Sequence, residues 1–255
     1  MKYLLSILSL SFLLFSCTEV AVYDETEESA ITGKYNTMKV VDDFIYAITD
    51  TELITIDRTD SQNLQEIDKH ELGGRLENLY VVDGAIFIGS ETDMHIFTIQ
   101  SNGIPSIQSS TQHIEFGDTP VRFCDPVVAS QDIAYVTLTT ETTAPGGCGT
   151  QEVNSLLIYD VHDKTAPILK NELNLDSPQG LAIHGDLLFV TNLNTGTHIY
   201  RVDHHGGLTN ENFIAGGAQD VVAVGNKLMI VSSTEINQYD ITDVKDIIHY
   251  GSIDL

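Results

Sequence analysis

The segment LYVVDGAIF, residues Leu79–Phe87, places two short apolar runs on either side of an Asp-Gly pair. Runs rich in β-branched and aromatic residues predict strands, and Asp-Gly tolerates the positive φ angles that a two-residue hairpin turn requires. Both runs are apolar at nearly every position. We therefore expect a tight β-hairpin whose two strands are covered on both faces.

Four other segments repeat this pattern of apolar run, polar turn and apolar run. They are MKVVDDFIY (Met38–Tyr46), VVASQDIAY (Val127–Tyr135), LAIHGDLLF (Leu181–Phe189) and VAVGNKLMI (Val222–Ile230). The hairpin thus recurs five times, with a period of about 40 residues, which is the signature of a repeat architecture.

Each hairpin is followed by a third strand that ends in a polar corner, as in ITIDRTD (Ile54–Asp60), LIYDVHD (Leu157–Asp163) and QYDITD (Gln238–Asp243). A more polar fourth strand follows, as in Ile168–Leu173. Aspartates in such corners are expected to cap the turn with their own side chains. Calcium ligation is the alternative, but the spacing differs from that of a calcium-binding loop.

Four short strands per unit, apolar in the first half and polar at the end, predict an all-β fold. We expect a five-bladed β-propeller of four-stranded antiparallel blades, formed by a single domain over residues 31–255. A two-sheet sandwich is the competing all-β fold, and it would not explain the fixed period.

The N-terminus has the features of an export signal. Met1-Lys2 precedes an uncharged leucine-rich run that ends in Leu14-Phe15-Ser16-Cys17, and we assign residues 1–16 to a signal peptide. This ending resembles the lipobox of bacterial lipoproteins, which implies that Cys17 is acylated and anchors the protein in a membrane. An ordinary signal peptide with a chance cysteine is the alternative. Residues 17–30 are expected to form an acidic flexible tether.

Two cysteines remain, Cys124 and Cys148. In an oxidising compartment outside the cytoplasm they are expected to form a disulfide. Two free buried thiols are the alternative. A metal site is not expected, because no second pair of metal-ligating residues accompanies them at a suitable spacing.

The segments Ser155–Pro167 and Leu187–Thr191 resemble the LVIVD repeat of bacterial and archaeal surface proteins. Asp125–Val128 with Ala134–Leu138, and Ser177–Ile183, fit the same pattern. The resemblance implies a propeller lipoprotein in the cell envelope, held at the outer membrane or cell surface. It implies no particular ligand or activity.

The net charge is −25, from 12 Lys and Arg against 37 Asp and Glu. Binding to nucleic acid is therefore not expected, because it requires a basic surface that releases counterions. Nucleophile elbows, phosphate-binding loops and zinc-protease motifs are absent from the sequence, so no catalytic residue, metal or cofactor is predicted.

One polar position recurs two residues before each inner strand. Its five members are Asn36, Glu77, Asp125, Gln179 and Asp220. Inner strands line the channel of a propeller, so these side chains would form a ring at one channel mouth, and Arg122 could orient an anion beside it. The ring would bind a ligand or a cation; alternatively, it only satisfies backbone groups of neighbouring blades.

These observations favour a monomeric, lipid-anchored binding or scaffolding module with a protein or polysaccharide ligand. Two alternatives remain. One is a secreted glycosidase-like hydrolase that uses the carboxylates at the channel mouth. The other is a purely structural surface module.

Overall fold

The computed structural model describes residues 35–113, 126–130, 132–139 and 153–255. Within these residues the chain forms 20 β-strands in five antiparallel sheets of four strands each, as expected. No helix in these ranges is long and apolar enough to span a membrane. Residues 1–30, which are expected to contain a signal peptide and a tether, and Cys17 among them, lie outside the described residues.

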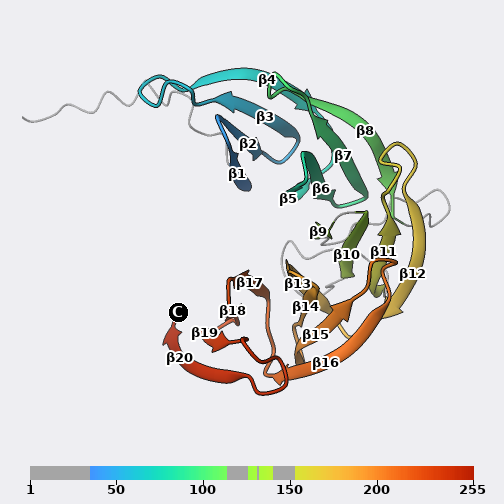
Figure 1. Ribbon diagram of the computed structural model, residues 1–255, viewed down its shortest axis with the longest axis vertical. Helices are drawn as coiled ribbons and strands as arrows, with labels where there is room; N and C mark the ends of the chain where they lie inside the picture. The colour runs from blue at the N-terminus through green and yellow to red at the C-terminus, as the bar shows by residue number, and fades with distance from the viewer. Residues whose placement is uncertain (1–34, 114–125, 131, 140–152) are drawn as a thin grey trace, which may run out of the picture. The chain divides into compact units, whose positions relative to one another are not determined.

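Each sheet is one blade, and its strands follow the chain from the centre outward (Figure 1). Blade 1 contains β1 (Thr37–Val41), β2 (Phe44–Ile48), β3 (Glu52–Asp57) and β4 (Gln65–Glu71). Blade 2 contains β5 (Leu76–Val82), β6 (Ala85–Ser90), β7 (Asp93–Ile99) and β8 (Pro105–Gln112). Blade 3 contains β9 (Val127–Ser130), β10 (Ile133–Thr139), β11 (Asn154–Asp160) and β12 (Ile168–Asn174). Blade 4 contains β13 (Pro178–His184), β14 (Leu187–Asn192), β15 (Gly196–Val202) and β16 (Leu208–Ala215). Blade 5 contains β17 (Asp220–Val224), β18 (Lys227–Val231), β19 (Glu235–Asp240) and β20 (Ile248–Asp254).

The inner hairpins form where the sequence predicts them. In blade 2, Val82 pairs with Ala85, and the two turn residues Asp83 and Gly84 have φ angles of 48° and 72°. Two successive positive φ angles are the geometry of the primed turn whose twist matches that of antiparallel strands.

Burial decreases from the second strand of a blade to its outer edge. Every residue of β6, β10 and β14 is buried, whereas β12 and β20 are exposed along almost their whole length. The second strands lie between two neighbouring blades and two neighbouring strands, which explains their continuous apolar sequence.

Adjacent blades pack face to face through apolar cores. Phe189 and Ile199 of blade 4, for example, pack against Val221, Leu228 and Ile230 of blade 5. Burying side chains of this size stabilises the fold by roughly 1.5–3 kcal/mol each.

Buried polar groups also link neighbouring blades. The hydroxyl of Tyr46 in blade 1 donates a 2.8 Å hydrogen bond to the Gly103 carbonyl in the corner of blade 2. This bond satisfies a phenol that is otherwise enclosed in the core.

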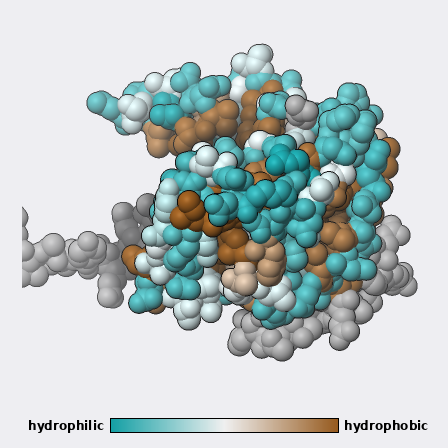
Figure 2. Space-filling view, turned by 60° about the horizontal axis from the view of Figure 1, so that its bottom comes forward, coloured by the Kyte–Doolittle hydropathy of each residue, from teal (hydrophilic) through white to brown (hydrophobic). Residues whose placement is uncertain are grey.

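The first and last blades differ from the expected fully covered hairpins. Met38 and Val40 of β1 and Val222 and Val224 of β17 are exposed, because each end blade packs against a neighbour on one face only. Among the described residues, strands of blade 5 are not closely packed against those of blade 1, and Figure 1 shows the two apart. Apolar patches remain between polar areas on the surface that Figure 2 shows.

The polar corners are turns capped by aspartate, as predicted. In blade 5, Asp240 Oδ1 accepts the backbone N–H of Thr242 at 2.8 Å, and Asp243 Oδ1 accepts that of Lys245 at 2.9 Å. Each carboxylate satisfies a backbone donor that the strand ladder does not reach.

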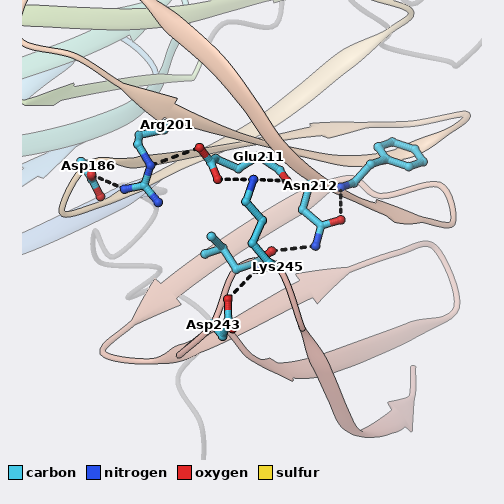
Figure 3. Close-up of polar contacts among 8 residues, drawn as sticks. Asp186, Arg201, Glu211, Asn212, Asp243 and Lys245 are labelled. Atoms are coloured by element: carbon cyan, nitrogen blue, oxygen red, sulfur yellow. Dashed lines mark hydrogen bonds and ion pairs between the residues drawn. The ribbon is translucent and has the colours of Figure 1, made fainter.

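The corner of blade 5 is joined to the outer strand of blade 4 by a polar cluster (Figure 3). Glu211 Oε2 lies 2.6 Å from Lys245 Nζ, and Glu211 Oε1 lies 3.2 Å from Arg201 Nε. Arg201 also pairs with Asp186. Beside them, Asn212 Nδ2 donates to the Val244 carbonyl at 2.7 Å.

Candidate functional site: the central cavity

A cavity of about 530 Å³ lies at the centre of the blades. The innermost strand, or the residue next to it, contributes to its wall in every blade, through Lys39, Tyr80, Pro126, Leu181 and Val222 among others. This volume is within the range of pockets that hold small ligands.

Glu77 and Gln179 reach the cavity from irregular positions in their strands. Leu76 pairs with Ser90 and Asn78 with Gly89, so the register of the ladder shifts at Glu77, which is an extra residue in β5. The pairing of β13 with β14 shifts in the same way around Gln179. An extra residue in one strand of a pair turns its side chain to a new direction. Both side chains line the cavity.

The backbone of Gln179 is fixed by the preceding blade. The buried hydroxyl of Thr137 donates to the Gln179 carbonyl at 2.7 Å. The Gln179 Nε2 amide, in contrast, is buried and has no hydrogen-bond partner within the described part of the chain. A buried donor without a partner costs free energy that a ligand acceptor can recover.

Asp220 lies beside Gly180 in the cavity wall. Its Oδ1 accepts the backbone N–H of Val221 at 2.8 Å. A Cβ atom on Gly180 would lie 2.5 Å from Asp220 Oδ1 and 2.7 Å from its Cα, so only glycine permits this approach. Asp220 is exposed to the cavity, and the partial loss of water around its carboxylate raises the pKa of Asp220.

In blade 5, the strand register shows that the residue equivalent to the other predicted ring members is one position earlier than Asp220. His184 and Val224 are the last residues before the hairpin turns of blades 4 and 5. Counted back from these two residues, Gln179 and Gln219 occupy the same position. Gln219 is therefore the structural equivalent of Gln179, and Asp220 is the equivalent of Gly180. Both Gln219 and Asp220 nevertheless line the cavity.

Asn36 has a structural role. Its Nδ2 donates to the Leu76 carbonyl at 2.7 Å and to Asp50 Oδ1 at 3.0 Å, which joins blade 1 to the start of blade 2. It is not among the described residues that line the cavity. This agrees with the alternative that polar residues at strand starts satisfy backbone groups of the next blade.

The remaining predicted residues lie outside the described residues. They are Asp125 of the ring, Arg122 beside it, and the expected disulfide partners Cys124 and Cys148. Within the described ranges, no group of three or more His, Cys, Asp or Glu side chains is placed to hold a metal ion.

Asn78 was not predicted from the sequence. Its Nδ2 donates to the Val127 carbonyl at 2.8 Å, and its Oδ1 accepts the Val127 N–H at 2.9 Å. The amide thus substitutes for a strand partner between blades 2 and 3. A polar residue inside an otherwise apolar inner strand is the signal that would have indicated it.

No family model matches the sequence, and no curated protein matches it. Solved structures resemble it in fold. A functionally unknown protein from Desulfotomaculum acetoxidans has a TM-score of 0.66 and 10% identity over 89% of this chain and 72% of that one. AztD from Citrobacter koseri has a TM-score of 0.57 and 13% identity over 84% of this chain.

A hypothetical selenium-binding protein from Sulfolobus tokodaii has a TM-score of 0.55 and 14% identity over 83% of this chain. The chain spans 61% of the AztD chain and 59% of the Sulfolobus protein. Structural similarity at such low sequence identity shows only that the proteins share a fold. This chain is therefore a β-propeller. Its described residues form five blades of four antiparallel strands.

Proposed function

We propose that this protein is an LVIVD-type envelope lipoprotein that binds a protein or polysaccharide ligand at its central cavity. The observation that carries the proposal is the buried Gln179 Nε2 amide, which has no hydrogen-bond partner among the described residues and lies in the same cavity wall as Asp220 and Glu77. A ligand acceptor would satisfy the amide, and the negative charge of the two carboxylates would attract a ligand donor or cation.

The charge of the cavity favours a basic ligand group. Glu77 and Asp220 oppose one lysine, Lys39, in the wall. The negative charge of the whole chain adds to the attraction of cations and repels anions. A basic side chain of a partner protein fits these charges, and a neutral hydroxylated group is the next best match.

The test is a calorimetric titration of the protein with tri-lysine and with tri-alanine. We expect tri-lysine to bind and tri-alanine not to bind. An Asp220→Asn variant should weaken tri-lysine binding about tenfold, equivalent to ~1.4 kcal/mol. Asp254→Asn removes the same charge from the exposed end of β20 and is the matched control.

Equal weakening by Asp254→Asn would indicate only a general charge effect and would contradict the proposal. The Gln179→Leu variant adds an independent test, since it removes the unpartnered amide without changing charge. Pull-down from the native envelope with wild type and Asp220→Asn would then identify the natural ligand.

The proposed anchor is tested separately. We expect the full-length chain to incorporate labelled palmitate and to fractionate with membranes. A Cys17→Ser variant should lose both properties. Label incorporation by that variant would rule out lipidation at Cys17.

A hydrolase remains the second candidate, favoured by the raised pKa of Asp220 beside a second cavity carboxylate. A carboxyl group that stays protonated to higher pH is suited to act as a general acid. Hydrolysis of aryl glycosides that is lost in Asp220→Asn would support this candidate, and absence of turnover would leave binding as the function.

A further inference from the structure

A second cavity, of about 700 Å³, lies away from the centre, at the outer junction of blades 3 and 4. The segment that leaves β12 contributes Asn174 and Asp176. Blade 4 contributes Asn192, His198, Asn210 and Phe213. We name this cavity the outer groove, and it shares no lining residue with the central cavity.

An aromatic surface forms one wall of the outer groove. The Phe213 ring lies with its centroid 4.8 Å from that of His198, and the His198 ring is stacked on Tyr200 at 5.8 Å. Phe213 is nevertheless 41% exposed. An exposed ring held in a fixed orientation offers a flat apolar surface to a ligand.

The backbone at Gly196 permits this placement of Phe213. Gly196 has a φ of 148°, and a Cβ atom there would lie 2.8 Å from Phe213 Cζ and 2.1 Å from the Ile214 carbonyl oxygen. The ring therefore packs directly over the peptide backbone. Only glycine combines this φ angle with such close contact.

The polar groups of the groove have free hydrogen-bonding capacity. The side chains of His198 and Asn210 make no hydrogen bond with other described residues, and Asp176 has only a 3.5 Å contact with Asn194. Burial lowers the pKa of His198 and so favours the neutral ring, which presents one donor and one acceptor. Side-chain amides likewise present both.

The charges in the groove exclude several ligand classes. Its lining residues include one carboxylate, Asp176, and neither lysine nor arginine. Phosphates and carboxylates would therefore enter without a cationic partner and against the net negative charge of the chain. Neutral hydroxyl groups, which donate and accept at the same atom, match the amides and the imidazole.

We propose that the outer groove binds a neutral saccharide. One face of a sugar ring would pack on Phe213, and its hydroxyl groups would bond to Asn210, His198 and Asp176. The proposal is independent of the function assigned to the central cavity.

The test is a titration of the full chain with maltotriose, cellotriose and chitotriose, followed through the NMR signal of the His198 ring. At least one of the three should shift this signal in a saturable manner, with a Kd of about 1 mM, which is typical of a weak single-site contact. Glucuronic acid, as the anionic probe, should not shift it.

Phe213→Ala and Asn210→Ala should each weaken binding about tenfold or abolish it. Thr209→Ala is the matched control, since Thr209 is an exposed neighbour that pairs with Arg201 and does not line the groove. Asp220→Asn should leave the titration unchanged. Unfolding temperatures within about 2 °C of wild type would show that the variants remain folded.

Two results would overturn the proposal. One is the lack of any shift with all three trisaccharides up to about 10 mM, well above the expected Kd. The other is a shift that persists unchanged in Phe213→Ala, because it would place binding elsewhere on the surface.

Discussion

The hydroxyl of Thr137 donates a 2.7 Å hydrogen bond to the backbone carbonyl of Gln179, so a side chain of blade 3 holds the cavity wall of blade 4. One blade further on, the hydroxyl of Thr191 lies between two acceptors, the Gly180 carbonyl of its own blade at 3.2 Å and the Gln219 carbonyl of the next blade at 3.3 Å. The two threonines occupy equivalent positions in β10 and β14, and both are fully buried. Buried threonines that do not line the cavity therefore hold the backbone of its wall in position.

Thr137→Val should destabilise the protein by about 1 kcal/mol, because it keeps the side-chain shape but leaves the Gln179 carbonyl without its donor. Urea denaturation of wild type and variant measures the difference. Thr209→Val, at an exposed position of β16, is the control and should lie within about 0.5 kcal/mol of wild type. Equal stability of Thr137→Val and wild type would contradict the role assigned to this bond.

Tyr46 and Tyr135 form a matched pair. They are equivalent residues of β2 and β10 and both are fully buried, but among the described residues only the Tyr46 hydroxyl has a partner, the Gly103 carbonyl. Tyr46→Phe should therefore cost about 1 kcal/mol, whereas Tyr135→Phe should be neutral or stabilising, since it removes a buried unpaired hydroxyl. Thermal unfolding of both variants measures the contrast, and a greater loss in Tyr135→Phe would contradict it.

Stability is expected to fall in mild acid because of His113. Burial lowers the pKa of His113 to about 4, below its ordinary value of 6.5. As the pH falls from 6.5, the unfolded chain binds the proton first, so the folded state loses up to about 3 kcal/mol by pH 4. Urea denaturation at pH 7, 5.5 and 4 measures this loss.

The His113→Gln variant should have a flatter pH profile, even if its stability at pH 7 is lower. His184→Gln, at an exposed position of β13, should keep the wild-type profile. Identical pH dependence in wild type and His113→Gln would assign the acid sensitivity to other groups.

Glu211→Gln should lower the unfolding temperature at low salt, because Glu211 joins Lys245 of blade 5 to Arg201 of blade 4 (Figure 3). The pKa of Glu211 is lowered chiefly by its bond to Lys245, so the stabilisation is present above the unfolded pKa and is lost in acid. The difference should shrink in 1 M NaCl, where charges are screened within about 3 Å. A salt-independent difference would point to packing instead.

The fold was largely predictable from the sequence, because the inner hairpins carry strong local signals. The turn pairs Asp83-Gly84 and Gly185-Asp186 fix both the position and the register of the strands they join. Continuous apolar runs then predicted the burial of the second strands. The exposure of Met38 and Val222 was missed, because a repeat pattern describes a blade with two neighbours and not one at an end.

The candidate site was only partly predictable. Glu77, Gln179 and Asp220 do line one cavity, but the sequence could not show that extra residues interrupt β5 and β13, or that Asn36 bonds to the next blade. The outer groove was not predicted at all. Its residues come from two blades, and the sequence alone does not distinguish the exposed ring of Phe213 from that of a buried core phenylalanine.

Every blade consists of consecutive strands from one continuous stretch of chain, and each strand pairs only with strands of that stretch. Genetic duplication or deletion of such a stretch would leave all other strand pairings intact, since blades are joined by packing and by hydrogen bonds such as that of Thr137 to Gln179, and not by shared strand ladders. Relatives with different numbers of blades are therefore within reach of a single recombination event. The central cavities of such relatives would differ in width. The hydrogen bond from a threonine like Thr137 to the inner strand of the next blade would be retained between each pair of blades.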